Sequence, residues 1–400
     1  MHKRFKQQGF HMLPIIAVLA VFALGGLIAW RVIMGMQHKA EDFGTSYGQN
    51  CKERDVAFTS PPLKMQDLNY IRPMGAMLDG HVTPTDHVYV SPANMDAADN
   101  TYPVLMPADG TVTEISRMPD QYIGDRKDVQ LAAEDHRLVL SFSCRYSSIY
   151  IHIHKLADPL AKAVQGIKAN ENKNVSIDLK AGDTVGYIGG STFDWTMVDN
   201  NTTLSGFITP DLYKREPWKI HTISPFDLYR GDLKTQMEAK SIRTVPPVGG
   251  KIDYDQRGKL VGTWFRSGTN GYEGSNQERY WDGHLSVVPD YIDPSYTIVS
   301  IGNWEGQAKQ FAVKGSPNPA TISEGTLAKF ELIPLSYVSN NPQADRRIFT
   351  KGMHPDTASA TVGTIAFQVQ SGEKLKVEKF PGKSAAQVTG LTAAAETYER

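Results

Sequence analysis

Residues 102–113 read YPVLMPADGTVT, and residues 181–189 read AGDTVGYIG. Both segments place short apolar runs beside a turn that contains Gly and Asp. Similar runs of about four to eight residues, separated by Gly and Pro, recur from about residue 67 to residue 229. Strands of this length and spacing are typical of an antiparallel sandwich or barrel. The sequence therefore predicts a mainly β fold.

A second series of apolar runs occupies residues 245–400, among them KLVGTWF, HLSVVP, YTIVSIG, AKFELIPL and VGTIAFQVQ. These runs predict a second antiparallel β domain, either a barrel or a sandwich. Gly262-Thr263-Trp264, near the first of them, is similar to the Gly-x-Trp of lipocalin-type barrels. We expect residues 231–237 to be a connector and residues 388–400 to form a short helix packed on the sheet.

Composition sets limits on function. The 400 residues contain 42 Lys and Arg against 43 Asp and Glu, and 40% of them are hydrophobic, enough to build real cores. The sequence shows no basic stripe with interleaved aromatic residues, which nucleic-acid binding requires, so we predict no nucleic-acid partner. P-loop and dinucleotide-binding motifs are also missing from the sequence.

The two cysteines, Cys51 and Cys144, are too far apart in the sequence for a CxxC metal or redox pair. A disulfide between them would stabilise the fold by roughly 4 kcal/mol. Two free thiols are the equal alternative, because pairing is not encoded in sequence spacing.

An apolar segment near the N-terminus predicts a membrane anchor. Residues 13–30 contain eighteen positions without a charge, and residues 31–36 can extend the run. This length spans most of a hydrocarbon core of ~30 Å. Because Lys3, Arg4 and Lys6 precede it, we expect a cytoplasmic N-terminus and an extracytoplasmic bulk, at a bacterial cell surface or in a periplasm. A cleaved signal peptide is the competing interpretation.

The N-terminus is also similar to a type IV prepilin leader, because Gly9-Phe10 stands between basic residues and the apolar run. Pro14 lies where pilins carry an early glutamate. A pilin-like surface subunit is therefore a minor alternative. The predicted organisation is a cytoplasmic head (1–12), a transmembrane helix (13–34), a stalk (35–62), a first β domain (63–235) and a second β domain (245–400).

Three motifs of the first β domain occur in the order of a known family. Residues 102–113 match its "pV.aPadGtV" segment, Tyr150-Ile-His152 is similar to its Y-x-H strand, and residues 181–189 match its "aGd.vG.iG" turn. The chain thus resembles the lysostaphin-type (LytM-like) zinc endopeptidases, which contain a duplicated hybrid motif and cut peptidoglycan cross-bridges. The resemblance covers under a quarter of the chain.

The resemblance implies a zinc site made by a His and an Asp four residues apart and by the second His of a later His-x-His strand. Three protein ligands leave an open position at which zinc lowers the pKa of a bound water toward ~7. Here His81 and Asp86 are five apart, and Thr192-Phe-Asp194-Trp195 stands where the family has His-Leu-His-Phe. The site therefore departs from the family pattern, and zinc is expected only if its ligands are rearranged.

Several polar residues remain as candidates around this site. His152 and His154, two apart on one strand, are predicted to share a sheet face and are the candidate catalytic residues. The candidate metal ligands are His81, Asp86, His87 and His152, and the predicted binding groove contains His81, Asp86, His87, Asp194, Trp195, Trp218 and His221.

These observations favour a membrane-anchored envelope protein. Its LytM-like domain would act as an inactive binding or scaffold module for the cell wall or for a protein partner. The alternative is a zinc-dependent peptidoglycan endopeptidase with rearranged ligands.

Overall fold

The computed structural model describes residues 51, 53–118, 134–339 and 348–400. The chain divides into two compact units, Met1–Gln49 and Asn50–Arg400, and the described residues belong to the second. The predicted head, the predicted transmembrane segment and most of the predicted stalk lie outside the described residues. Within these ranges, no helix is long and apolar enough to cross a membrane.

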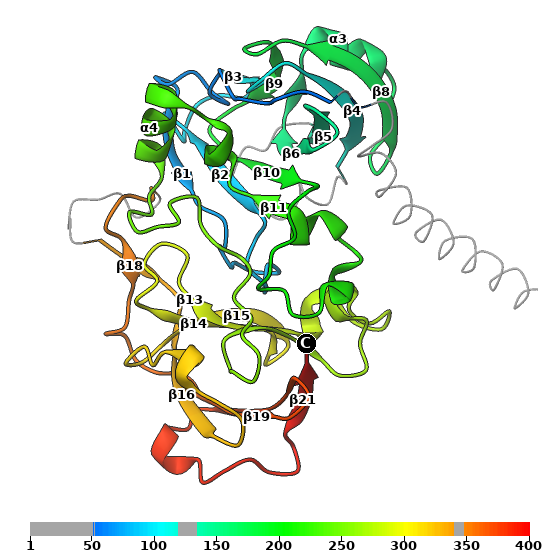
Figure 1. The fold of residues 1–400 in the computed structure, drawn as a ribbon. Helices are drawn as coiled ribbons and strands as arrows, with labels where there is room; N and C mark the ends of the chain where they lie inside the picture. Colours follow the sequence, from blue (N-terminus) through cyan, green and yellow to red (C-terminus); the bar gives the residue numbers. More distant parts are fainter. Residues whose placement is uncertain (1–50, 52, 119–133, 340–347) are drawn as a thin grey trace, which may run out of the picture. The chain divides into compact units, whose positions relative to one another are not determined.

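The prediction of a mainly β fold is confirmed. In the described residues the main sheet of the first β domain is antiparallel and eight-stranded (Figure 1). Its order is β1 (Leu68–Arg72), β2 (His87–Pro92), β10 (Phe193–Asp199), β6 (Tyr146–Ile153), β5 (His136–Ser141), β4 (Gly110–Arg117) and β8 (Asn172–Leu179), with β11 (Thr222–Ile223) paired to β10.

A three-stranded sheet contains the two segments that decide the fold, with the order β3 (Tyr102–Leu105), β9 (Thr184–Ile188) and β7 (Lys155–Leu156). The glycine of β9 permits this pairing, because a Cβ on Gly186 would lie 2.5 Å from the Lys155 carbonyl oxygen. Val104, Val185 and Ile188 of this sheet pack in the same apolar core as Trp195 of the large sheet. Buried apolar area of this kind is the main source of stability of such a domain.

Helices are few and short in the described residues. The α-helices are α3 (Asp158–Ala163) and α4 (Gly231–Lys240), and the 3₁₀ turns of this region are η1 (Pro210–Tyr213), η2 (Pro217–His221) and η3 (Pro225–Leu228). The expectation of a connector at residues 231–237 is wrong, because this stretch is the start of α4. Met237 is the buried residue of α4 and belongs to the core, so tertiary packing stabilises a helix whose apolar pattern is weak.

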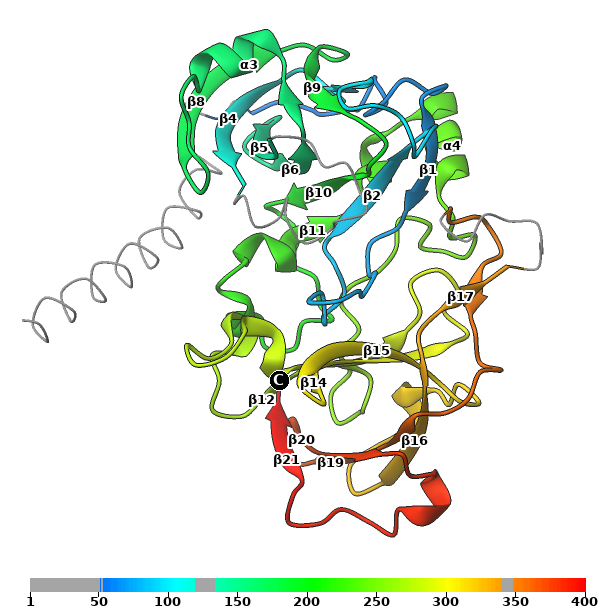
Figure 2. The same ribbon diagram turned by 180° about the vertical axis from the view of Figure 1, so that it is seen from behind.

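The second β domain is a closed antiparallel barrel, which decides between the predicted barrel and sandwich (Figure 2). Its strands are β12 (Gly262–Arg266), β13 (His284–Pro289), β14 (Thr297–Trp304), β15 (Gln307–Val313), β16 (Leu327–Pro334), β19 (Gly363–Gln370), β20 (Lys374–Pro381) and β21 (Glu396–Glu399). Shorter elements accompany it: η4 (Gly271–Glu273), η5 (Tyr280–Gly283), η6 (Pro319–Thr321), η7 (Ala385–Gln387), β17 (Tyr337–Val338) and β18 (His354–Pro355). The helix expected at residues 388–400 is wrong: β21 pairs with both β12 and β20 and closes the barrel.

One end of the barrel is organised around Trp264 and Arg400. Trp264 is fully buried, and its Nε1 donates to the Leu260 carbonyl oxygen at 2.9 Å. The Arg400 guanidinium lies 3.9 Å from the centre of the Trp264 ring. It also donates to the carbonyl oxygens of Val261 and Lys259, so it joins the last strand to the chain that enters the first. A buried guanidinium needs such partners to offset its desolvation.

A disulfide joins Cys51 to Cys144, with 4.9 Å between their Cα atoms and a sequence separation of 93. The pairing that the sequence left open is therefore decided. The packed chain also begins before the predicted end of the stalk at residue 62. Phe58 is 2% exposed and stacks on Trp195 with 5.8 Å between ring centres.

The outer face of the barrel is covered where it meets the first β domain. Val288, Ile298, Ala312 and Ile333 lie on β13 to β16 and form a buried cluster with Met77, which belongs to the loop between β1 and β2. Side chains that alternate with these residues, such as Val287 and Val299, fill the barrel interior instead. The barrel thus has an apolar interior and an apolar outer patch.

Candidate functional site

Three neighbouring strands bring most of the predicted polar residues together. In the ladder between β2 and β10, His87 lies opposite Thr196 and Tyr89 lies opposite Asp194. Opposed residues share a face of an antiparallel sheet, so His87 and Asp194 project to the same side. Val88 and Trp195 alternate with them and enter the core. The site is therefore on the face of the sheet that points away from that core.

His152 reaches this face because β6 is irregular. The register with β5 shifts between His136 and Leu138, and His152 has a φ of 71°. Tyr150 and Ile153 on either side of the irregularity are both fully buried in the core. A β-bulge of this kind places two residues where one would stand and re-aims a side chain. Left-handed backbone at a non-glycine residue costs about 1–3 kcal/mol and is concentrated at functional sites.

Five side chains form an alternating series of carboxylates and imidazoles. His87 Nδ1 lies 3.2 Å from Asp86 Oδ1, and His87 Nε2 lies 3.4 Å from Asp194 Oδ2. The same Asp194 oxygen lies 3.5 Å from His152 Nε2, and His152 Nδ1 lies 2.7 Å from Asp135 Oδ2. The series is Asp86, His87, Asp194, His152 and Asp135, with Asp194 between the two imidazoles. We call these five residues the carboxylate–imidazole chain.

In the carboxylate–imidazole chain, neighbouring groups of opposite charge stabilise each other's charged forms. Burial alone would lower the pKa of His87, but the carboxylates of Asp194 and Asp86 outweigh it and raise that pKa. Burial would raise the pKa of Asp86, but the Lys219 ammonium and hydrogen bonds from His87 and Trp218 hold it well below its usual range. The carboxylates of Asp86 and Asp194 therefore favour the protonated form of His87.

A short 3₁₀ turn, η2, supplies the partners of Asp86. Trp218 Nε1 donates to Asp86 Oδ2 at 2.7 Å. Lys219 is 2% exposed, and its Nζ lies 5.2 Å from the centre of the Tyr272 ring. The pKa of Glu216 is raised by burial and by the Asp86 carboxylate. This turn thus fixes Asp86, and Asp86 in turn fixes the orientation of His87.

The remaining predicted site residues lie elsewhere. Trp195 is in the core, where its Nε1 donates to Ser148 Oγ at 2.8 Å. His154 lies just after the end of β6, and its Nε2 lies 3.1 Å from Ser191 Oγ. His221 Nδ1 lies 2.6 Å from the Thr202 carbonyl oxygen. The ring of His81 is 5.8 Å from that of His87, so His81 lies beside the carboxylate–imidazole chain.

Sequence reasoning missed Asp135 and Lys219. Asp135 follows Glu134 in a polar stretch, and nothing in its pattern separates it from a solvated acidic residue. Lys219 lies between Trp218 and Ile220, and only the neighbouring Trp218 and His221 were expected at the groove. The one available signal was their proximity in sequence to His136 and Trp218, which is weak.

The resemblance to zinc endopeptidases raises the question of whether these residues fit a metal. Both imidazoles have a carboxylate at Nδ1, as zinc-bound histidines commonly do. However, a metal ligand must be a neutral imidazole, whereas the pKa of His87 is raised. Across the described residues, no group of three or more His, Cys, Asp or Glu side chains is placed to hold a metal ion. As placed, the residues fit an ion-paired chain and not a zinc site.

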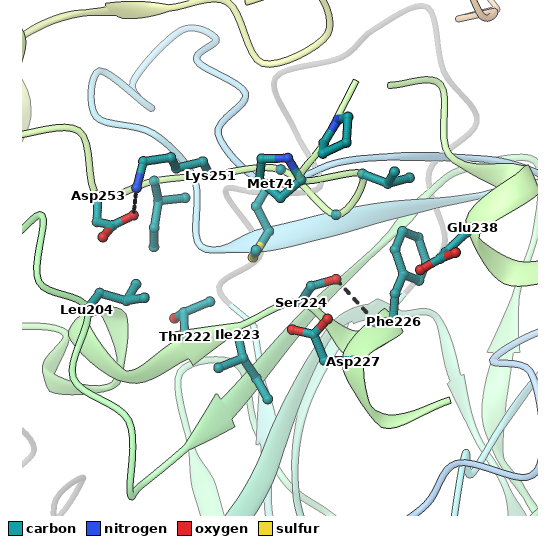
Figure 3. A pocket seen from close by; sticks show the side chains of 16 residues that line it. Met74, Leu204, Thr222, Ile223, Ser224, Phe226, Asp227, Glu238, Lys251 and Asp253 are labelled. Atoms are coloured by element: carbon teal, nitrogen blue, oxygen red, sulfur yellow. Dashed lines mark hydrogen bonds and ion pairs between the residues drawn. The ribbon is translucent and has the colours of Figure 1, made fainter. Parts of the chain in front are cut away.

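A separate pocket of about 460 Å³ lies apart from the carboxylate–imidazole chain (Figure 3). It is lined by Met74, Leu204, Thr222, Ile223, Ser224, Phe226, Asp227, Glu238 and residues 246–253. None of the residues of the carboxylate–imidazole chain lines it. Its size is that of a small-ligand site.

Comparison with known proteins gives little. No protein-family model matches the chain, and no curated protein matches it. Among solved structures, the chain is similar to the NMR solution structure of lysostaphin, at 10% identity and a TM-score of 0.16. That match covers 79% of this chain and 80% of lysostaphin. A TM-score this low supports no inference about function.

Stability should depend on pH through His87. A raised pKa in the fold adds stability that is fully present below the unfolded value of 6.5 and is lost as pH rises through the folded value. Asp194→Asn should lower the His87 pKa and weaken this dependence, as measured by urea unfolding at several pH values and by NMR titration of the imidazole. Asp211→Asn, whose side chain is 84% exposed, is the control. Identical His87 titration in wild type and Asp194→Asn would contradict the assignment.

Proposed function

We propose that the chain is a membrane-anchored envelope protein whose LytM-like first domain is a binding or scaffold module without peptidase chemistry. The module would bind the cell wall or a protein partner at the membrane surface. One observation carries the proposal: Asp194 lies within ion-pair distance of both His87 and His152. In the family that the sequence resembles, a zinc-binding histidine would stand at this position.

The position of the carboxylate–imidazole chain supports a binding role. The His152 side chain is 37% exposed, and His81 is exposed beside His87, whereas the Asp194 side chain is only 9% exposed. Ligand groups would therefore reach the imidazoles of His152 and His81 first. The Asp135 carboxylate, 2.7 Å from His152 Nδ1, would hold the His152 imidazole in place.

The disulfide supports an extracytoplasmic location. Stable disulfides form in secreted and periplasmic proteins and are rare in the cytosol. Cys51 lies shortly after the predicted transmembrane segment, and its bond to Cys144 attaches that end of the chain to the first domain. This agrees with an anchor on the N-terminal side and a folded body outside the cytoplasm.

The test uses the full chain, purified in detergent. We expect zinc to be far below one per chain, co-sedimentation with isolated peptidoglycan, and no release of wall peptides. His152→Ala should weaken the co-sedimentation, whereas His354→Ala should not, because His354 stacks on Tyr296 in the second domain.

Two results would overturn the proposal. Stoichiometric zinc that a chelator removes, that is lost in His87→Ala and that accompanies release of wall peptides would establish the rearranged zinc endopeptidase. The binding role would be rejected by two negative results together. The full chain would fail to sediment with peptidoglycan, and it would capture no envelope protein whose binding is lost in the His152→Ala variant. A mature N-terminus at Phe10, seen by mass spectrometry, would instead favour the pilin-like alternative.

A further inference from the structure

The pocket in Figure 3 is lined by residues from several segments of the chain. Met74 follows β1, Thr222 to Asp227 span β11 and η3, Glu238 belongs to α4, and residues 246–253 lead toward the barrel. Pockets at junctions between domains are frequent ligand sites. This inference does not rest on the proposed function, because the pocket and the carboxylate–imidazole chain share no residue.

Close backbone packing holds the walls of this pocket in place. Met74 N donates to the Gly249 carbonyl oxygen at 3.0 Å. Gly250 has a φ of 90°, and a Cβ there would lie 2.2 Å from the Met74 carbonyl oxygen. A Cβ on Gly249 would lie 2.0 Å from Ser224 Oγ. Only glycines permit this approach, so the pocket is a fixed feature of the fold.

The walls combine an apolar surface with an excess of acidic groups. Met74, Ile223 and Phe226 supply apolar side chains. Lys251 is ion-paired with Asp253, so this pair is locally neutral. Figure 3 shows Glu238 and Asp227 on the side of the pocket near Phe226, away from that pair.

Asp227 is an exposed carboxylate on the wall of the pocket. Glu238 has a partner, since Lys234 Nζ lies 3.7 Å from its Oε1, whereas no ion pair is formed by the Asp227 carboxylate among the described residues. Partial desolvation and the nearby Glu238 carboxylate raise the pKa of Asp227, although Lys234 and Arg230 act against the shift. A cation placed beside Asp227 would relieve both effects.

We propose that this pocket binds an organic cation with an unbranched apolar stem. The alkyl stem would contact Met74, Ile223 and Phe226, and the ammonium would lie at Asp227 and Glu238. A lysine side chain of a peptide and a free diamine share this chemistry.

The experiment titrates the full chain, labelled with ¹³C at its methionine methyls, with pentylammonium. We expect the chemical shift of the Met74 methyl to change in a saturable manner and that of the remote Met353 methyl to remain unchanged. Asp227→Asn should weaken binding by about tenfold, because a charge-assisted contact is lost. Asp232→Asn is the control, since Asp232 is exposed on α4, the helix that carries Glu238, and lies outside the pocket.

Two further probes assign the source of the cation. Binding of 1,5-diaminopentane without binding of a lysine-containing peptide would identify a free amine, and binding of both would identify a peptide side chain. Pentanol, which has the stem without the charge, should bind far more weakly. The proposal is overturned if pentylammonium leaves the Met74 signal unchanged, if Asp227→Asn binds as wild type does, or if pentanol binds equally well.

Discussion

Arg400→Met is expected to lower the free energy of unfolding by about 3–5 kcal/mol, the usual cost of removing one member of a buried ion pair. The Arg400 side chain is 1% exposed and interacts with Glu373 and Asp255. It also donates to backbone carbonyl oxygens near β12 and stacks on Trp264. Methionine would fill part of the space but leave the buried carboxylates without a cation. Urea unfolding of the full chain measures the loss.

The pH dependence of this loss separates it from simple packing damage. Burial raises the pKa of Asp255 to about 6, and the Arg400 guanidinium opposes that rise. Without Arg400 the Asp255 pKa should rise further, so the loss of stability should be larger at about pH 8 than at about pH 5.

Lys314→Met is the control. It removes an ion pair with Glu331, but the Lys314 side chain is 60% exposed, and such surface pairs contribute about 0–1 kcal/mol. Equal losses in the Arg400→Met and Lys314→Met variants would contradict the role given to Arg400.

Loss of the Cys51–Cys144 disulfide should cost about 4 kcal/mol of unfolding free energy, because the bond closes a long loop in the unfolded chain. The double variant Cys51→Ser, Cys144→Ser removes the bond with little change in volume. Denaturant unfolding with and without a reducing agent measures the effect. The wild-type chain under reducing conditions should match the double variant.

The double variant also provides its own control, since reducing agent should not change its stability. An unchanged midpoint on reduction of the wild-type chain would show that the bond does not constrain the unfolded state. Arg54, whose guanidinium donates to the Phe142 and Asp109 carbonyl oxygens, helps to hold the same segment. Some native contact near Cys51 should therefore survive reduction.

Much of the fold follows from sequence, and the parts that do not have identifiable causes. The runs around Pro107 and Gly182 predicted strands correctly, because Gly and Pro mark turns by their backbone conformations. The C-terminal strand β21 was missed, since Glu396–Glu399 is mostly polar and is a strand only through its pairing with β12 and β20. Long-range pairing of this kind is not visible in a local pattern.

The candidate site shows the same division. His87, Asp194 and His152 were identified as candidates, and adjacent strands do bring them together. The bulge at His152 could not be predicted, because simple alternation assigns a face to every residue of a strand. Asp135 was missed for a related reason: its importance comes from where the bulge directs His152.

The covered outer patch of the barrel has a consequence for how this chain can be shortened or recombined. Val288, Ile298, Ala312 and Ile333 are buried only because Met77 and its neighbours lie over them. A deletion that removed either β domain would expose an apolar surface of the other to water, and such a surface promotes aggregation. We therefore expect the two β domains to fold as one unit, and mutational studies should use point substitutions and not domain deletions.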